Sequence, residues 1–165
     1  PTEVIGMPSN RILTKGDMLM MDTGAVFDGY FSDFDRNFCF GCVDETVAAA
    51  YDVVYRAMDA GLEAARPGIN AEGLWKVMAD ILSESTPSKN AVGRLGHGLG
   101  MQLTEWPSNM KGDKTVMQPG MVMTLEPCIE FADGRIMVHE ENIVIRDGEP
   151  ELLSIRAPSE IPLIY

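Results

Sequence analysis

The chain has 165 residues, enough for one domain with a hydrophobic core, and its 45% hydrophobic and 23% charged residues are ordinary for a globular protein. Its formal net charge of −12, without any basic stripe, argues against nucleic acid and against an anionic membrane as partners. No apolar run approaches the roughly 18 residues of a membrane span, we expect no signal peptide, and three cysteines, an odd number, indicate a reducing, cytoplasmic location.

The first part of the chain predicts a loop followed by a hairpin. Because the sequence begins with Pro1 and a loop-like stretch, we expect a segment of a longer protein. Residues 15–41 hold two apolar-rich runs around Asp28-Gly29, a dipeptide typical of a two-residue hairpin turn. Two antiparallel strands are therefore expected here.

Two helices are expected next. Residues 44–65 carry apolar side chains at steps of three and four, which mark one face of a helix. Asn70 is expected to cap a second helix, from Ala71 to about Ser85. The predicted inward side chains are Val47, Tyr51, Val54, Met58 and Leu62 in the first helix, and Leu74, Met78, Ile81 and Leu82 in the second.

Strands and Gly-rich turns return after the helices. Residues 91–103, 120–131 and 134–145 each read as one strand, and Asp133-Gly134 is expected to join the last two as a hairpin. The two prolines of residues 158–165 indicate a loose or docking tail. Grouped helices and antiparallel hairpins together predict the α+β fold class.

Five polar side chains stand in apolar or Gly-rich strand contexts, where an unpaired buried carboxylate would be costly. One imidazole and four carboxylates are ligand types for two divalent ions that share bridging oxygens. Two such ions about 3.5–4 Å apart can activate a nucleophile and stabilise a tetrahedral intermediate. Without cations, four converging acids would repel one another. The five residues are Asp22, Asp33, His97, Glu126 and Glu140.

Taken singly, each of these residues has an ordinary structural interpretation. An Asp after a strand is usually a turn former, and a His in a Gly-rich stretch is usually structural. The hairpin strengthens the metal interpretation, because we expect its two arms to bring Asp22 and Asp33 side by side across the ladder. Asp35 is instead interpreted as pairing with Arg36 or with a neighbouring strand, outside the ligand set.

Four ordered segments resemble the pita-bread metallopeptidases, which include methionine aminopeptidases, aminopeptidase P, prolidases and creatinase-like enzymes. Residues 16–41 are similar to the D-x-G…GY-x-S-D-x-x-R stretch of that superfamily, and residues 96–107 (GHGLGMQLTEWP) to its H-G-x-G segment. Residues 119–127 (PGMVMTLEP) and 134–145 resemble its P-G-M-x-x-T-x-E-P segment and its terminal glutamate strand. The compact spacing is most similar to that of prolidases and Xaa-Pro aminopeptidases. The resemblance implies a pita-bread fold, a curved antiparallel sheet with helices packed on its outer face.

The resemblance also implies roles for the five residues. Two divalent metal ions (Mn, Co, Fe or Zn) would be bound, with Asp22 bidentate to one ion and Asp33 and Glu140 bridging both. His97 and Glu126 would bind the second ion and are the expected catalytic residues, with Glu126 handling the proton of the attacking water.

The last ligand has two adjacent candidates in the sequence. When the apolar triplet at residues 143–145 is aligned with the terminal strand of the resembled family, the resemblance implies that the ligand is Glu140, three residues before it. Strand alternation would then turn Glu141 to the other face.

Two positions depart from the pattern of the peptidases. Thr104 stands where the family usually has a second His, and Val138 stands where prolidases often have an Arg. Both missing groups help hold the substrate, so the metal site is better supported than Xaa-Pro specificity. His139 could supply a replacement imidazole, although adjacent strand residues point in opposite directions.

The family's catalytic domain has two pseudo-symmetric halves. We expect residues 1–165 to form the C-terminal two-thirds of such a domain, with the first half upstream, and a homodimer to form through the full-length chain. The predicted function is a dinuclear metal-dependent hydrolase that cleaves a C–N bond in a small peptide or amide, similar to an Xaa-Pro peptidase. The alternatives are a superfamily lyase that acts by metal-assisted elimination on a small molecule, and a non-catalytic pita-bread domain that binds peptides or proteins.

Overall fold

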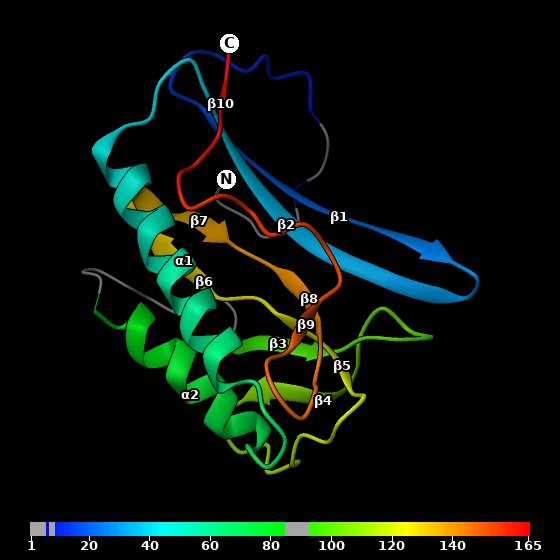
Figure 1. Cartoon of the computed structure of the whole chain (residues 1–165). Helices are drawn as coiled ribbons and strands as arrows, with labels where there is room; N and C mark the ends of the chain where they lie inside the picture. The colour runs from blue at the N-terminus through cyan, green and yellow to red at the C-terminus, as the bar shows by residue number, and fades with distance from the viewer. Residues whose placement is uncertain (1–5, 7–8, 85–92) are drawn as a thin grey trace.

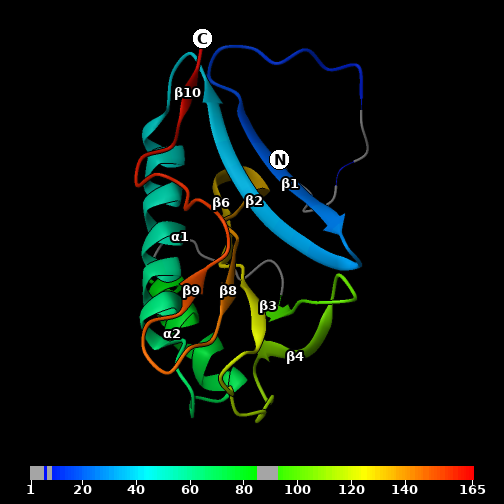
Figure 2. The ribbon, with the colours of Figure 1, turned by 45° about the vertical axis from the view of Figure 1, so that its right-hand side comes forward.

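The computed structural model describes residues 6, 9–84 and 93–165, which form the α+β fold that the sequence predicts. Two helices lie together along one side of the strands, and a long hairpin reaches away from them on the other side (Figure 1 and Figure 2). Neither described helix combines the length and the apolar character that a membrane crossing requires.

The elements follow one another in the order β-β-α-α and then a series of short strands. They are β1 (Met18–Phe27), β2 (Tyr30–Phe40), α1 (Glu45–Ala64), α2 (Ala71–Leu82), β3 (Arg94–Gly98), β4 (Glu105–Met110), β5 (Val122–Leu125), β6 (Cys128–Phe131), the 3₁₀ turn η1 (Ala132–Gly134), β7 (Arg135–Val138), β8 (Glu141–Val144), β9 (Glu151–Leu152) and β10 (Leu163–Ile164).

The predicted hairpin is confirmed, but one expected pairing within it is wrong. Asp28 and Gly29 both have positive φ angles, 53° and 85°, as a tight two-residue turn requires. This turn sets the register of β1 against β2 and pairs Asp22 with Asp35. Asp33 pairs with Gly24 and is therefore a diagonal neighbour of Asp22.

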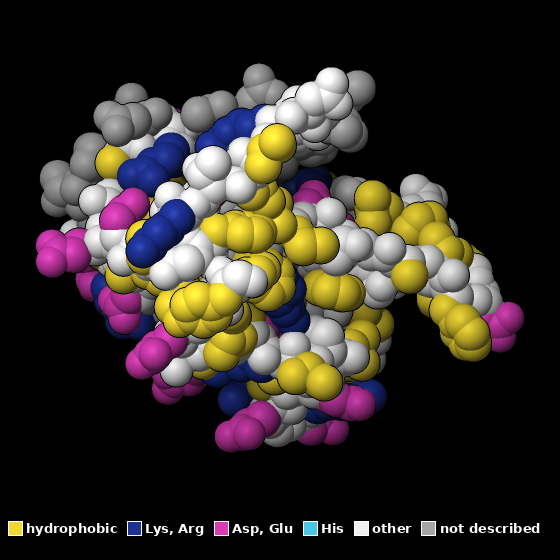
Figure 3. Space-filling view, turned by 90° about the horizontal axis from the view of Figure 1, so that it is seen from above, with side chains coloured by type: hydrophobic (Ala, Val, Ile, Leu, Met, Phe, Trp, Pro, Cys, Tyr) yellow, Lys and Arg dark blue, Asp and Glu magenta, His cyan; other side chains and the backbone are white. Residues whose placement is uncertain are grey.

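The outer half of this hairpin contributes little to the core. Val26, Phe27 and Tyr30 are all exposed, and Figure 3 shows hydrophobic side chains along the projecting arm. The backbone ladder between the two strands is therefore the main interaction that holds this part of the structure.

Side-chain caps and one buried face fix both helices, and the Asn70 cap is the one that the sequence predicted. Asp44 accepts a hydrogen bond from the Val47 N–H (2.8 Å) at the start of α1, and Asn70 accepts one from the Gly73 N–H (2.7 Å) at the start of α2. The second helix ends at Leu82, and the predicted end near Ser85 lies outside the described residues. Val47, Tyr51, Val54, Met58, Leu74, Met78 and Leu82 are buried in the core, whereas Leu62 and Ile81 are half-buried.

Two segments that read as single strands are each broken in two. Residues 120–131 form β5 and β6, and residues 134–145 form β7 and β8. β5 pairs with β8 in one sheet, while β6 pairs with β7 in another, so the chain changes sheet at each break. Pro127 marks the first break, because proline has no N–H to donate to a ladder. Glu126 and Glu140 stand in these two breaks.

Two further features complete the sheets. β4, which the sequence analysis did not predict, contains Pro107 and lies at the edge of the sheet β4-β3-β5-β8-β9, where proline is tolerated. The tail docks rather than hangs loose: Ile161 is buried in the core, and Leu163 in β10 pairs in parallel with Cys39 in β2.

Candidate metal centre

Side chains from β1, β2, β3 and the break before β8 converge on one acidic cluster. Asp33 from β2, His97 from β3 and Glu140 each offer one ligand atom, and these atoms lie within 4.8 Å of one another. A second group, Asp22, Asp35 and Glu140, satisfies the same limit. Glu140 belongs to both, so the described residues form two adjoining groups that could each hold a metal ion.

The imidazole of His97 has the orientation of a metal ligand. His97 is 2% exposed, and its Nδ1 lies 2.8 Å from the carbonyl oxygen of Gly98. A carbonyl can only accept, so Nδ1 carries the proton and Nε2 is free to bind a cation. Nε2 faces Asp33 Oδ2 and Glu126 Oε1, each 3.7 Å away. Burial lowers the pKa of His97, which favours this neutral form.

Glu126 lies beside this group without being part of it. Its Oε1 is 3.7 Å from His97 Nε2 and 3.4 Å from Arg94 Nε. Burial raises the pKa of Glu126 to about 7, although the Arg94 guanidinium acts in the opposite direction. A carboxyl group that titrates near neutrality can exchange a proton with a bound molecule.

Burial also disfavours the charged forms of the other acids. It raises the pKa of Asp33 to about 6, that of Asp35 to about 8 and that of Glu140 to about 10, and in each case neighbouring carboxylates add to the effect. Among the described residues, three buried oxygens of the cluster lack any hydrogen-bond partner: Asp35 Oδ1, Glu126 Oε1 and Glu140 Oε1. Buried polar atoms are rarely left unpaired, and divalent cations would satisfy these oxygens and remove the repulsion. The residues present therefore fit metal ions.

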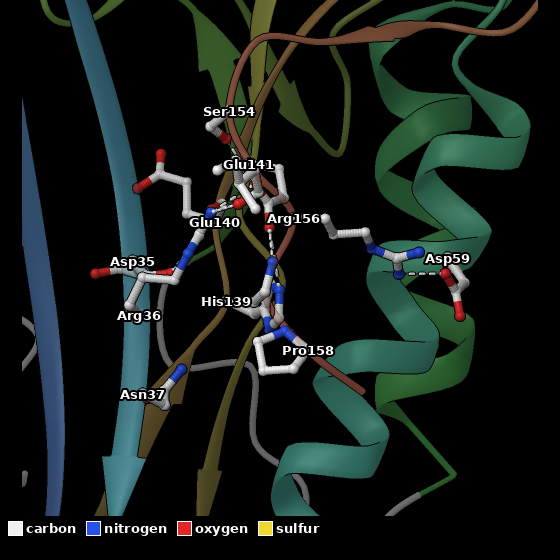
Figure 4. Close-up of polar contacts among 12 residues, drawn as sticks. Asp35, Arg36, Asn37, Asp59, His139, Glu140, Glu141, Ser154, Arg156 and Pro158 are labelled. Atoms are coloured by element: carbon white, nitrogen blue, oxygen red, sulfur yellow. Dashed lines mark hydrogen bonds and ion pairs between the residues drawn. The ribbon is translucent and has the colours of Figure 1, made fainter. Parts of the chain in front are cut away.

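Glu140 and Glu141 differ sharply although they are adjacent and both buried. Glu141 accepts hydrogen bonds from Arg36 Nη2 (2.9 Å), the Ser154 hydroxyl (2.8 Å) and the Ala157 N–H (3.0 Å), as Figure 4 partly shows. Burial would raise its pKa, but His139 and these donors outweigh burial and lower it. The carboxylate of Glu141 is thus held by protein donors and stabilises the structure, whereas Glu140 faces the acidic cluster.

Neither position that departs from the peptidase pattern belongs to these two groups. Thr104 is exposed in the loop before β4, and Val138 is buried beside Cys128 and Ile136. The ring of His139 packs against Tyr51 and Tyr55 with centroids 5.8 Å apart in both pairs, and its Nε2 lies 3.5 Å from Glu141 Oε1. His139 therefore points to the Glu141 side, as strand alternation predicts.

A cavity of about 390 Å³ has a mostly apolar and Gly-rich lining, to which none of the cluster's acids and not His97 belongs. Its lining includes Phe31, two residues before Asp33, Gly98, next to His97, and Met123, three residues before Glu126, together with Trp106. The Trp106 indole N–H donates to Thr115 Oγ1 (2.8 Å), which orients a large apolar ring at this cavity.

Sequence reasoning overlooked two residues at the centre. Asp35 was expected to pair with Arg36, but Arg36 Nη1 donates to the Asp35 backbone carbonyl (2.8 Å), and the carboxylate joins the acidic cluster instead. The turn at Asp28-Gly29 was the available signal, because it already dictates which residue faces Asp22. Arg94 was not considered at all: strict alternation would turn it away from His97, and an irregularity of β3 between the two residues removes that alternation.

The sequence comparison agrees with this geometry. Residues 3–147 match the family described as Metallopeptidase family M24. The chain belongs to metallopeptidase family M24. It is 31% identical over 148 residues to the Xaa-Pro dipeptidase of Pyrococcus furiosus, covering 89% of this chain and 42% of that protein. It is also 32% identical over 142 residues to the Xaa-Pro dipeptidase of Lactobacillus helveticus, covering 86% of this chain and 39% of that protein.

Solved structures confirm the pita-bread fold of this M24 chain. The dipeptidase crystal structure from Pyrococcus horikoshii superimposes with a TM-score of 0.92 at 28% identity, over 99% of this chain and 46% of that chain. The chain thus spans less than half the length of the relatives it matches. The upstream half-domain and the five individual ligand assignments remain predictions.

Proposed function

We propose that this M24 chain supplies the dinuclear metal centre of a hydrolase that cleaves the C–N bond of small peptides, with Xaa-Pro dipeptides as the substrate class. Asp22, Asp33, His97, Glu126 and Glu140 would hold two divalent ions. The substrate class follows the two relatives named as Xaa-Pro dipeptidases.

One observation carries this proposal. Asp35 and Glu140 are buried, Asp33 and Glu126 are half-buried, and Asp22 lies at the exposed edge of the cluster. These acids repel one another and are partly without hydrogen-bond partners among the described residues, while Nε2 of a neutral histidine faces them. A structure that only needed a folded core would satisfy these oxygens with protein donors, as it does for Glu141. The arrangement is therefore better suited to binding cations than to stability.

The side chains around the ions would have separate tasks. When bound, the ions supply Lewis acidity, which activates a water and polarises the substrate carbonyl. Glu126 would accept the proton of that water and pass it to the leaving amine, a role that suits its pKa of about 7. Arg94, 3.4 Å from Glu126, would keep this carboxylate oriented and limit how far burial raises its pKa.

The cavity lined by Phe31, Gly98, Trp106 and Met123 supports a small apolar substrate. Phe31, Trp106 and Met123 contribute apolar side chains to its lining. A proline ring is compact and apolar, so it suits a wall of this kind.

The test begins with metal content. We expect the protein reconstituted with Mn²⁺ to bind two ions by elemental analysis and to hydrolyse Xaa-Pro dipeptides faster than Xaa-Ala dipeptides. Asp33→Asn should lose ions and activity together, whereas Asp28→Asn, at the exposed hairpin turn, should keep both. Protein that binds no divalent ion after reconstitution would overturn the proposal.

A second candidate function rests on Thr104 and Val138. These replace the His and Arg that hold substrate in the peptidases, and neither offers a charge. Metal-assisted elimination on a small molecule would need the ions and a proton acceptor, but not those two groups. Full metal occupancy without hydrolysis of any dipeptide would favour this reaction over peptide cleavage.

A further inference from the structure

Asp35 is a buried carboxylate at the metal centre with no part in the mechanism above. It stands in β2 directly opposite Asp22 and two residues beyond Asp33. Residues two apart in a strand face the same side, so the two acids of β2 face the cluster together. Asp35 is only 4% exposed, and one of its oxygens lies within 4.8 Å of oxygens from Asp22 and Glu140.

Arg36, the neighbouring cation, does not neutralise this carboxylate. Its guanidinium donates to Glu141 Oε2 (2.9 Å) and to the backbone carbonyls of Asp35 and Glu140 (2.8 and 2.9 Å). Figure 4 shows the Arg36 side chain directed toward Glu141, while the Asp35 carboxylate extends to the other side of β2. Oδ1 of Asp35 has no hydrogen-bond partner among the described residues.

Two states could accommodate such a group. Asp35 could stay protonated and act as a neutral donor, or it could be ionised beside a bound cation. The charges of the whole cluster favour the second state. Five carboxylates would face two divalent ions, and Arg94, 3.4 Å from Glu126, adds a positive charge beside them.

We infer that Asp35 is an additional ligand of the ion held by Asp22 and Glu140. This inference rests on the proposed metal centre and adds a residue to it. The two ions would then have different surroundings, because carboxylates alone approach the first, whereas His97 faces the second. Oxygen-only sites suit hard ions such as Mn²⁺ or Mg²⁺, and imidazole also suits Zn²⁺.

Asp35→Asn separates the two states, because asparagine keeps the shape and a hydrogen-bond donor but removes the charge. Metal-free protein would be titrated with Mn²⁺ and, separately, with Zn²⁺ by calorimetry. We expect the wild type to bind two Mn²⁺ ions. The variant should bind one of them at least about 10-fold more weakly, since even losing an outer-shell partner typically costs about 10–100-fold. The loss of affinity caused by Asp35→Asn should be larger for Mn²⁺ than for Zn²⁺.

Asp28→Asn is the matched control. Asp28 is exposed at the hairpin turn with φ 53°, a conformation that asparagine also tolerates, so only the charge changes. Two Mn²⁺ ions bound by Asp35→Asn with wild-type affinity would overturn the role of Asp35 and leave the metal centre intact. No ion bound by the wild type would instead overturn the proposed function itself.

Folding of the variant is checked in the metal-free state. Asparagine removes a buried charge, so metal-free Asp35→Asn should melt at or above the wild-type temperature while gaining less from added Mn²⁺. If Asp35→Asn does not fold, Asp35→Ser, which is smaller and neutral, gives the same comparison. A wild-type melting shift with Mn²⁺ in a folded neutral variant contradicts the inference.

Discussion

Arg36 and Glu141 form a buried ion pair, Nη2 to Oε2 2.9 Å, that joins the hairpin to the strand beside the candidate metal centre. Through Nη1 the same guanidinium also binds the carbonyls of Asp35 and Glu140, whose carboxylates face the acidic cluster. Arg36 therefore links β2 to the break before β8. It holds the backbone of Asp35 and of Glu140, and so fixes where their carboxylates lie.

Arg36→Ala should destabilise the protein strongly. The substitution leaves Glu141, which is fully buried, without its cation, and breaking a buried pair typically costs about 3–5 kcal/mol. Urea denaturation would measure the change in the free energy of unfolding. Arg56→Ala is the control, because its partners Asp52 and Glu84 are both exposed and a surface pair contributes only about 0–1 kcal/mol. Equal losses for the two variants would contradict the structural role of Arg36.

Glu140→Gln and Glu141→Gln form a matched pair of substitutions at adjacent buried positions. Glu140→Gln should bind fewer divalent ions and leave the metal-free protein at least as stable as the wild type, since a repelled charge is removed. Glu141→Gln should keep the ions but lose stability, because hydrogen bonds to a charged group are each worth about 1.5–3 kcal/mol. Elemental analysis and denaturation distinguish them, and the reverse pattern would show that Glu141 is the ligand.

The metal-free protein should become less stable as the pH rises. Asp33, Glu126 and Glu140 have folded-state pKa values raised to about 6, about 7 and about 10, whereas unfolded carboxyls titrate near about 4. Between the pKa of the unfolded carboxyls and the raised pKa of each group, the native state binds more protons than the unfolded chain. The stability that these groups provide at low pH is therefore lost as the pH increases.

Denaturation in chelator at about pH 5, 7 and 9 would measure this trend. Ions compete with protons for the same oxygens, so the stabilisation by added Mn²⁺ should grow over the same range. Glu141, whose pKa is lowered, acts oppositely and only at more acid pH. A metal-free protein that is more stable at pH 9 than at pH 5 would contradict the electrostatic account of the cluster.

Gly96→Ala should disturb the position of His97. Gly96 has φ +131°, and an added Cβ would lie 2.2 Å from the Thr124 carbonyl oxygen, so β3 must shift away from β5. We expect a loss of about 1–3 kcal/mol in the free energy of unfolding and weaker ion binding. Gly93→Ala, where a Cβ meets nothing within 4 Å, is the control in the same segment and should leave both unchanged.

Local signals in the sequence determined much of this protein. Asp28-Gly29 specified a tight turn, Asn70 capped a helix, and steps of three and four marked the faces that are buried. These outcomes depend on interactions within a few residues, which is why the sequence predicts them. The motifs around Asp22, Asp33, His97, Glu126 and Glu140 likewise indicated the family, because the resemblance covers ordered segments of nearly the whole chain.

The surroundings of each acid were decided only by the tertiary structure. The sequence shows Glu126 and Glu140 inside continuous apolar runs, but the chain changes sheet at both points and leaves these residues in breaks. Asp35 and Glu141 look equivalent to their neighbours along the chain. Arg36, 105 residues from Glu141, satisfies Glu141 and leaves Asp35 in the acidic cluster. Whether a buried carboxylate is neutralised by a protein cation or left open to a metal ion depends on such long-range contacts, which no local pattern encodes.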